Sequence, residues 1–177
     1  MREAVYLGGF ITCDGKAGRE VTRRIGESNR LFDSLEIVWK HAFISKSRKV
    51  QIYQTCIIPK LLYSLESIWL LQNERNKLDA FHHKCLRKCM GIPMSYISRI
   101  RNVDVLGQAK SELLSTLLAR VQTTTYSRIM QSPEDSVIKK FVCDGMGAAI
   151  NWENNRRKGR PRQRCAASVH SMGLLVR

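Results

Sequence analysis

Apolar residues recur every three or four positions along successive stretches of the chain, which is the spacing of one face of an α-helix. These stretches cover residues 19–41, 45–69 and 73–90, and a fourth pattern covers residues 111–130. Residues 134–143 fit a short additional helix. The largest residues of the first three apolar stripes form the predicted core: Phe32, Trp39, Tyr53, Leu62, Trp69, Leu78 and Phe81.

Local signals predict where the helices begin and end. Ser45 and Asn73 stand where a helix N-cap is expected, because their side-chain oxygens can accept a hydrogen bond from the first turn. Pro59 breaks or kinks the second stretch, since proline has no backbone N–H to donate. Gly91 followed by Pro93 is the order typical of a helix C-terminus, so we expect the third helix to end there.

The first residues of the chain have a different pattern. Residues 4–12, AVYLGGFIT, are rich in residues that favour strands, and Asp14-Gly15 is typical of a turn. A single strand would leave its backbone groups unpaired. Either the chain folds back from Thr12 onward as a hairpin, or the strand pairs with residues outside this chain.

These patterns predict a mainly α fold, a thumb-like bundle of three to four helices with a short N-terminal strand or hairpin and a disordered basic C-terminal tail. We expect residues 1–15 to form the strand and turn, and residues 16–100 the helical domain. Residues 101–135 add a helix and a loop, and residues 136–177 form the tail.

The charge of the chain changes the picture from a generic bundle to a nucleic-acid-binding candidate. Thirty Lys and Arg against 15 Asp and Glu give a formal net charge of +15. Such an excess is most often neutralised by nucleic acid. A membrane surface is the rival partner, but the chain has no lipidation motif. We expect an intracellular protein, the nucleus included, because the N-terminus does not have the apolar core of a signal peptide.

Two groups of cations are the candidate nucleic-acid-binding residues. The first lies off the apolar stripe of residues 19–41, and the second lies in the sequence RRKGRPRQR at 156–164. Together they comprise Arg19, Arg23, Arg24, Arg30, Arg156, Arg157, Lys158, Arg160, Arg162 and Arg164. The sequence KGRPR also fits an AT-hook, in which a Gly-Arg-Pro core lies in a narrow minor groove. From the tail alone, this hook and a phosphate-binding arm are equally supported.

The sequence predicts no catalytic residue, no resident metal and no cofactor. Metal-dependent polymerases and nucleases need clustered carboxylates, whereas the acidic residues here are scattered. The best metal candidate is HHKCLRKC, with Cys85 and Cys89 four residues apart on one helix face. Cys85 also continues the apolar stripe, so we interpret both as core cysteines rather than zinc ligands. We expect His82 and His83 to face solvent or phosphate.

The order of several motifs resembles the C-terminal part of LINE-type (non-LTR) retrotransposon reverse transcriptases. The motifs are YLGGFIT-CDG, EVTRRIGESNRLFDSL, ISKSRKVQIYQTCIIPKLLYSLESIW, LDAFHHKCLRKCMGI and the basic RRKGRPRQR. Residues 4 to 92 match in order and spacing, about half of the chain. The resemblance implies the end of the palm, then helices of a thumb that grip a template–primer duplex by its backbone, then a basic arm.

The chain departs from this family in ways that bear on function. The Tyr/Phe-x-Asp-Asp catalytic strand would lie upstream of Met1, so we expect no polymerase centre in this chain. The Gly-His pair that often precedes the tail is missing, and Cys165 stands where a Trp is usual. Two alternatives stay open: a stand-alone DNA-binding or chromatin-associated protein with an AT-hook-like tail, and a non-functional decayed copy.

Overall fold

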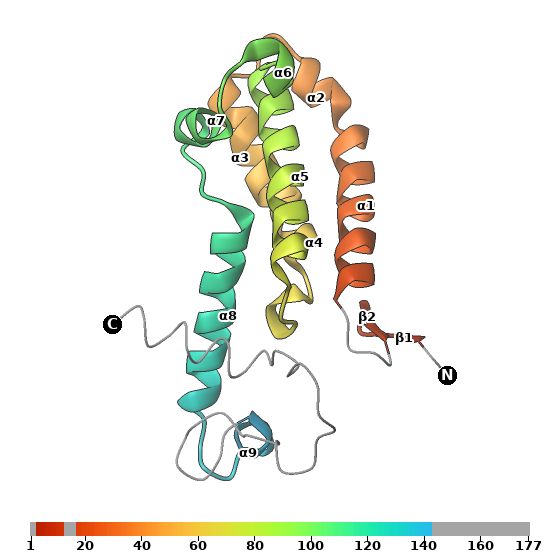
Figure 1. Cartoon of the computed structure of the whole chain (residues 1–177), viewed down its shortest axis with the longest axis vertical. Coiled ribbons are helices and arrows are strands. Elements are labelled where there is room, and N and C mark those ends of the chain that lie inside the picture. Colours follow the sequence, from red (N-terminus) through yellow and green to blue (C-terminus); the bar gives the residue numbers. More distant parts are fainter. Residues whose placement is uncertain (1–2, 13–16, 143–177) are drawn as a thin grey trace. The chain divides into compact units, whose positions relative to one another are not determined.

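The chain is mainly helical and begins with a short antiparallel hairpin, which confirms the predicted fold class (Figure 1). The computed structural model describes residues 3–12 and 17–142; the predicted basic tail lies outside them from residue 143 onward. Contacts divide the chain into two compact units. The first contains residues up to Leu65 and Leu70–Leu117, and the second contains Glu66–Trp69 and residues from Leu118 onward.

The N-terminal hairpin pairs β1 (Glu3–Tyr6) with β2 (Gly9–Thr12), so that Tyr6 lies opposite Gly9. Leu7 and Gly8 form the turn and both have positive φ, 46° and 75°. Two-residue turns of this kind match the twist of the paired strands. The prediction of one strand over residues 4–12 was therefore wrong, because the turn lies inside that segment. The pairing partner of β1 is β2 of this same chain, so the first residues form a hairpin.

The first predicted helix divides into α1 (Gly18–Ser34) and α2 (Glu36–Lys40), which meet at Leu35. The break brings the Trp39 ring onto the Phe32 ring, with the two ring centroids 4.7 Å apart. The indole Nε1 of Trp39 donates a hydrogen bond of 2.7 Å to the carbonyl of Phe32. A buried indole N–H needs such an acceptor, and an uninterrupted helix would have kept that carbonyl in its own ladder.

The second predicted helix also has two parts, α3 (Lys46–Cys56) and α4 (Ile58–Leu62), followed by a 3₁₀ turn, η1 (Leu65–Ser67). The predicted cap at Ser45 is confirmed, since its Oγ accepts from the backbone N–H of Arg48 at 3.2 Å. Pro59 lies in the first turn of α4, where its missing N–H costs no helical hydrogen bond.

The third helix, α5 (Gln72–Met90), is capped at Leu71 rather than at Asn73 as predicted. The carboxylate of Glu74 accepts from the backbone N–H of Leu71 at 2.7 Å, and this contact starts the helix earlier. The predicted end is confirmed, because Gly91 adopts the left-handed conformation at φ 67°. The later helices are α6 (Ser95–Ser98), α7 (Asn102–Ala109), α8 (Leu114–Met130) and α9 (Val137–Val142).

The core of the first unit lies where α1, α3 and α5 contact one another. Most of the predicted core residues are buried: Phe32, Trp39, Tyr53, Leu78 and Phe81. Leu62 and Trp69 are half-buried. After α5, the segment that contains α6 lies over the end of α5 (Figure 1), and Arg87 of α5 donates to Asn102 at the start of α7.

Candidate nucleic-acid interface

The four candidate arginines of α1 have different environments. Arg19 and Arg30 are exposed, and Arg30 has no hydrogen bond or ion pair within residues 3–12 and 17–142. Arg23 is half-buried, and Arg24 is buried with an exposed fraction of 5%. The prediction that all four lie off the buried side of the helix was therefore wrong for Arg24, which lies on the same side of α1 as the buried Ser28.

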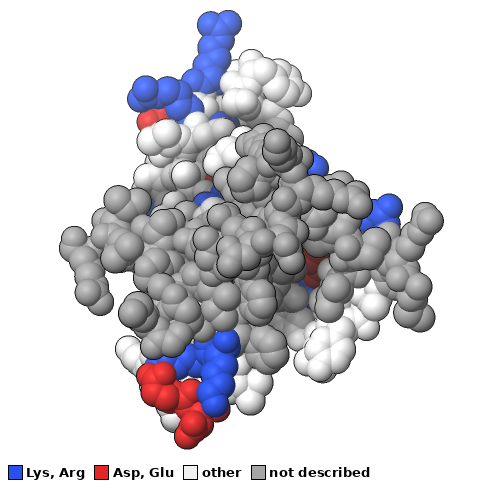
Figure 2. All heavy atoms as spheres, turned by 60° about the horizontal axis from the view of Figure 1, so that its bottom comes forward, with Lys and Arg blue, Asp and Glu red and all other residues white. Residues whose placement is uncertain are grey.

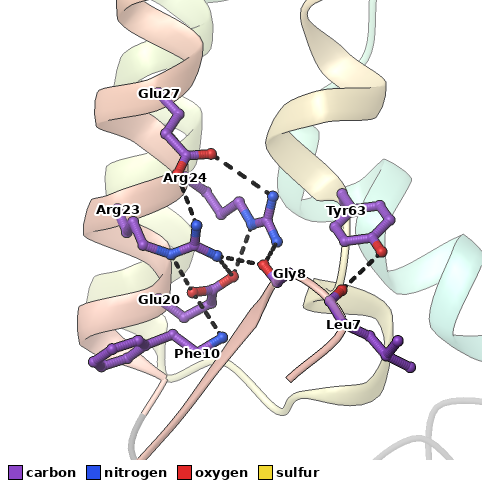
Figure 3. A network of polar contacts seen from close by, with 8 residues as sticks. All are labelled: Leu7, Gly8, Phe10, Glu20, Arg23, Arg24, Glu27 and Tyr63. Atoms are coloured by element: carbon purple, nitrogen blue, oxygen red, sulfur yellow. Dashed lines mark hydrogen bonds and ion pairs between the residues drawn. The ribbon is translucent and has the colours of Figure 1, made fainter. Parts of the chain in front are cut away.

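Arg23 and Arg24 are neutralised by two carboxylates of the same helix. The buried Glu20 accepts hydrogen bonds of 2.7 Å from both guanidinium groups, and Glu27 accepts another of 2.7 Å from Arg23 (Figure 3). These partners are three and four residues apart, which is the spacing of neighbours on a helix surface. Because the two arginines are paired with two glutamates, this site has no net positive charge to attract a phosphate.

Both guanidinium groups also bind the hairpin turn. Arg23 donates to the carbonyl of Gly8 at 2.6 Å, and Arg24 donates to the same oxygen (Figure 3). On the other side, the Tyr63 hydroxyl donates to the carbonyl of Leu7 at 2.9 Å, and the Arg24 guanidinium lies 4.7 Å from the centre of the Tyr63 ring. We call this group the turn cluster: Leu7, Gly8, Glu20, Arg23, Arg24 and Tyr63.

The electrostatics of the turn cluster follow from burial and pairing. Burial alone would raise the pKa of Glu20, but its hydrogen bonds and charge contacts with Arg23 and Arg24 outweigh burial and lower it. Glu20 is therefore ionised in the folded protein, and it also accepts from the backbone N–H of Phe10 at 3.2 Å. The arginines of this cluster hold the hairpin against α1.

The exposed side of α5 is a better place for phosphate contacts. Its residues, which we call the lysine face, are Asn73, Lys77, Ala80, Lys84 and Lys88. The three lysines are separated by seven and four residues, so they follow one side of the helix. Lys77 and Lys84 stand about 10 Å apart along the axis, at 1.5 Å per residue.

The three lysines differ in how far their charge is compensated. Lys77 has no hydrogen bond or ion pair within the described part of the chain, and Lys84 donates only to the neutral amide of Asn29, at 3.2 Å. Lys88 lies 3.5 Å from Asp33 and is partly compensated. The sequence reasoning missed this face, although the spacing between the lysines, on a helix whose apolar stripe was recognised, could have revealed it.

The surrounding sequence increases the local cationic charge. Residues 80–103 contain five Lys and Arg and no Asp or Glu. Elsewhere on the surface, charges are mixed: on the side shown in Figure 2, described basic side chains stand in separate groups, and acidic side chains lie beside the group at the lower edge. The lysine face differs because the two carboxylates of α5 are engaged elsewhere: Glu74 accepts from the backbone of Leu71, and Asp79 accepts from the backbone of Ser115.

The histidine and cysteines singled out in the sequence lie on the inner side of α5. His82 is fully buried, with Nδ1 2.9 Å from the Tyr53 hydroxyl and Nε2 3.2 Å from Ser111 Oγ. The expectation that it faces solvent or phosphate was wrong. Burial lowers the pKa of His82 to about 4 and raises that of Cys89 to about 12. His82 is therefore neutral near pH 7, and Cys89 keeps its proton and is not ready to bind a metal as a thiolate.

The described residues contain no group of three or more His, Cys, Asp or Glu side chains arranged to hold a metal ion. No helix within residues 3–12 and 17–142 has the length and apolar character needed to cross a membrane. The basic candidates Arg156, Arg157, Lys158, Arg160, Arg162 and Arg164 lie outside the described residues. Comparison of the chain with family models, curated proteins and solved structures found no match.

Proposed function

We propose that the chain binds a template–primer duplex by its backbone, as the thumb-like segment of a non-LTR retrotransposon reverse transcriptase, without a polymerase centre of its own. The observation that carries this proposal is the lysine face of α5, where Lys77 and Lys84 are exposed and not compensated by carboxylates. Phosphate contacts of this kind position a duplex without reading its sequence.

The helical core supports the proposal by making α5 a rigid support. α5 is long, its inner side packs against α1 and α3, and its two ends are fixed by the Glu74 cap and by Gly91. Lysines on such a helix keep a constant spacing. At 3.4 Å of axial rise per phosphate in one strand, the roughly 10 Å between Lys77 and Lys84 spans about three phosphates.

The test compares two double variants that remove the same amount of charge. Lys77→Ala with Lys84→Ala removes two cations from the lysine face, and Lys46→Ala with Lys60→Ala removes two exposed cations from α3 and α4. Binding to an RNA–DNA duplex is measured at several salt concentrations. The first variant should lower the slope of log K against log salt by roughly 0.9 for each phosphate that is no longer neutralised, about 1.8 in all.

The control variant should change that slope by less than the effect of one phosphate, about 0.9. Equal effects of the two variants would mean that the chain attracts nucleic acid only through its overall charge, and would overturn the assignment to α5. In a primer-extension assay the chain alone should incorporate no nucleotide. Incorporation of nucleotides that EDTA abolishes would contradict the proposal that the chain has no polymerase centre of its own.

A further inference from the structure

The loop that follows α5, residues 93–102 with the single turn of α6 inside it, carries the most exposed tyrosine of the described residues. Tyr96 is 80% exposed, and its neighbours Met94 and Ile97 are 45% and 62% exposed. Single exposed side chains of this size are common, but three neighbours in one short segment form a patch, and such patches often mark binding sites. Here they point outward although the loop itself is held firmly, so their exposure needs an explanation.

The buried Arg87 holds this loop. Its guanidinium donates to the carbonyl of Pro93 at 2.9 Å, to the carbonyl of Ile100 at 2.6 Å and to the amide oxygen of Asn102 at 2.9 Å. It also donates to Ser98 Oγ at 3.2 Å. Arginine suits this role because its five N–H groups are arranged in a fixed plane. The loop is therefore preorganised, and Tyr96 is presented at little further entropic cost.

The charge around Tyr96 indicates an anionic partner. Arg99 and Arg101 lie three and five residues after Tyr96 and are both exposed. Arg101 contacts Asp104 at 3.3 Å, whereas Arg99 has no carboxylate partner within the described residues. The loop continues from the end of α5 at which Lys88 lies. Lys84 and Lys88 therefore belong, with the cations of this loop, to one stretch without acidic residues, residues 80–103.

Exposed aromatic side chains next to cations are the combination that binds unpaired nucleotides. Bases stack on the ring while the cations contact the backbone, and this arrangement does not depend on base identity. Tyrosine and arginine also occur in protein interfaces, but a run of cations without acidic residues favours a polyanion as the partner. We infer that the loop of residues 93–102 binds single-stranded nucleic acid, with Tyr96 as the stacking platform and Arg99 as a backbone contact. This inference rests on the proposed function, which it extends from the duplex to an adjoining unpaired strand.

The experiment uses the full chain and two probes, a blunt RNA–DNA duplex and the same duplex with a short single-stranded overhang containing 2-aminopurine. The wild type should bind the overhang probe more tightly and quench the 2-aminopurine fluorescence. Tyr96→Ala should remove the quenching and weaken overhang binding by roughly fivefold or more, with blunt-duplex affinity unchanged. Tyr96→Phe should restore both signals, because the ring alone supports stacking.

Tyr6→Ala is the matched control, since Tyr6 is an exposed tyrosine of the hairpin; it should leave both signals unchanged. Equal binding of the two probes by wild type and Tyr96→Ala would overturn the inference while leaving duplex binding intact. Failure to bind either probe would instead contradict the proposed function. Vesicles containing phosphatidylserine provide the third probe. Tyr96-dependent binding to them, without a preference for the overhang, would assign the loop to a membrane surface and overturn the inference.

Discussion

The turn cluster and the lysine face are both rich in cations, yet they use them in opposite ways. In the turn cluster, Arg23 and Arg24 are bound by Glu20 and Glu27 and donate to a backbone carbonyl. On the lysine face, Lys77 and Lys84 point away from the core and have no carboxylate partner. The number of basic residues in a segment is therefore a poor guide to surface charge. Whether a carboxylate contacts each cation decides it.

The largest expected effect is the difference in stability lost when a cation is removed from each of these two regions. Arg24→Ala removes one of the two guanidinium groups that compensate the buried Glu20. We expect a loss of about 3 kcal/mol in the free energy of unfolding, the lower end for breaking a buried ion pair, because Arg23 still contacts Glu20. Lys84→Ala should change it by less than about 0.5 kcal/mol. Urea denaturation measures both, and similar losses in the two variants would contradict the comparison.

The second effect is a dependence of stability on pH, which comes from His82 on the inner side of α5. The folded pKa of His82 is about 4 and its unfolded value is about 6.5. Between these values the unfolded chain binds the proton and the folded chain does not, so stability falls as the pH falls from 6.5 to 4. At 1.36 kcal/mol per pKa unit the loss is about 3 kcal/mol. Below pH 4.5, Glu20 adds a loss in the same direction, since its folded pKa is lowered.

The measurement is the free energy of unfolding at a series of pH values. His82→Gln should weaken the dependence between pH 6.5 and 4, because His82 no longer titrates. A smaller part should remain from His83, whose pKa is also lowered by burial. The matched control is His41→Gln, since His41 is exposed; it should retain the wild-type dependence. A His82→Gln profile as steep as that of the wild type would show that other groups cause the loss.

The third effect tests how closely Gly9 of the hairpin packs against Ser64. A Cβ on Gly9 would lie 2.5 Å from Ser64 Oγ, so Gly9→Ala forces that side chain to move and should cost about 1–2 kcal/mol. In contrast, a Cβ on Gly26 of α1 has nothing within 4 Å. Gly26→Ala should stabilise the protein by roughly 0.5–1 kcal/mol through helix propensity. Thermal unfolding should show shifts of opposite sign, and two shifts of the same sign would contradict this geometry.

The smallest expected effect concerns the basic sequence at 156–164, which extends the comparison to cations outside the described residues. Arg160→Ala with Arg162→Ala should lower the salt slope of duplex binding by roughly 0.9 per phosphate, equally for an A-tract and a G·C-rich duplex. A phosphate-binding arm gives a difference between the two duplexes below about tenfold, or 1.4 kcal/mol. A larger preference for the A-tract would favour the AT-hook, which reads a narrow minor groove.

The sequence predicted those parts of the fold that depend on local chemistry. The cap at Ser45 and the helix end at Gly91 are set by one or two residues each, and both are confirmed. The turn at Leu7 and Gly8 was missed because Leu7 rarely adopts positive φ. Its conformation is supported by Tyr63, Arg23 and Arg24, which come from other elements. No pattern within residues 4–12 contains that information.

The candidate site was predicted less well, for a related reason. Arg24 was placed off the apolar stripe, since a charged residue is expected outside, but it occupies the buried side of α1 beside Glu20. Arg87 was likewise not recognised as structural, because its acceptors include backbone carbonyls that leave no mark in the sequence. In contrast, the spacing of Lys77, Lys84 and Lys88 was available from the sequence and was overlooked.

The contacts of the Leu7–Gly8 turn also fix an order of assembly. The turn depends on Arg23 and Arg24, and on Tyr63, which is 56 residues from Leu7. Closing a loop of that length costs entropy before any contact forms. The strained turn therefore forms after α1 and α4 are in place, and it is among the first parts to open. The backbone amide of Phe10, bound to Glu20, should accordingly exchange its hydrogen through local opening, far faster than the amides of α5.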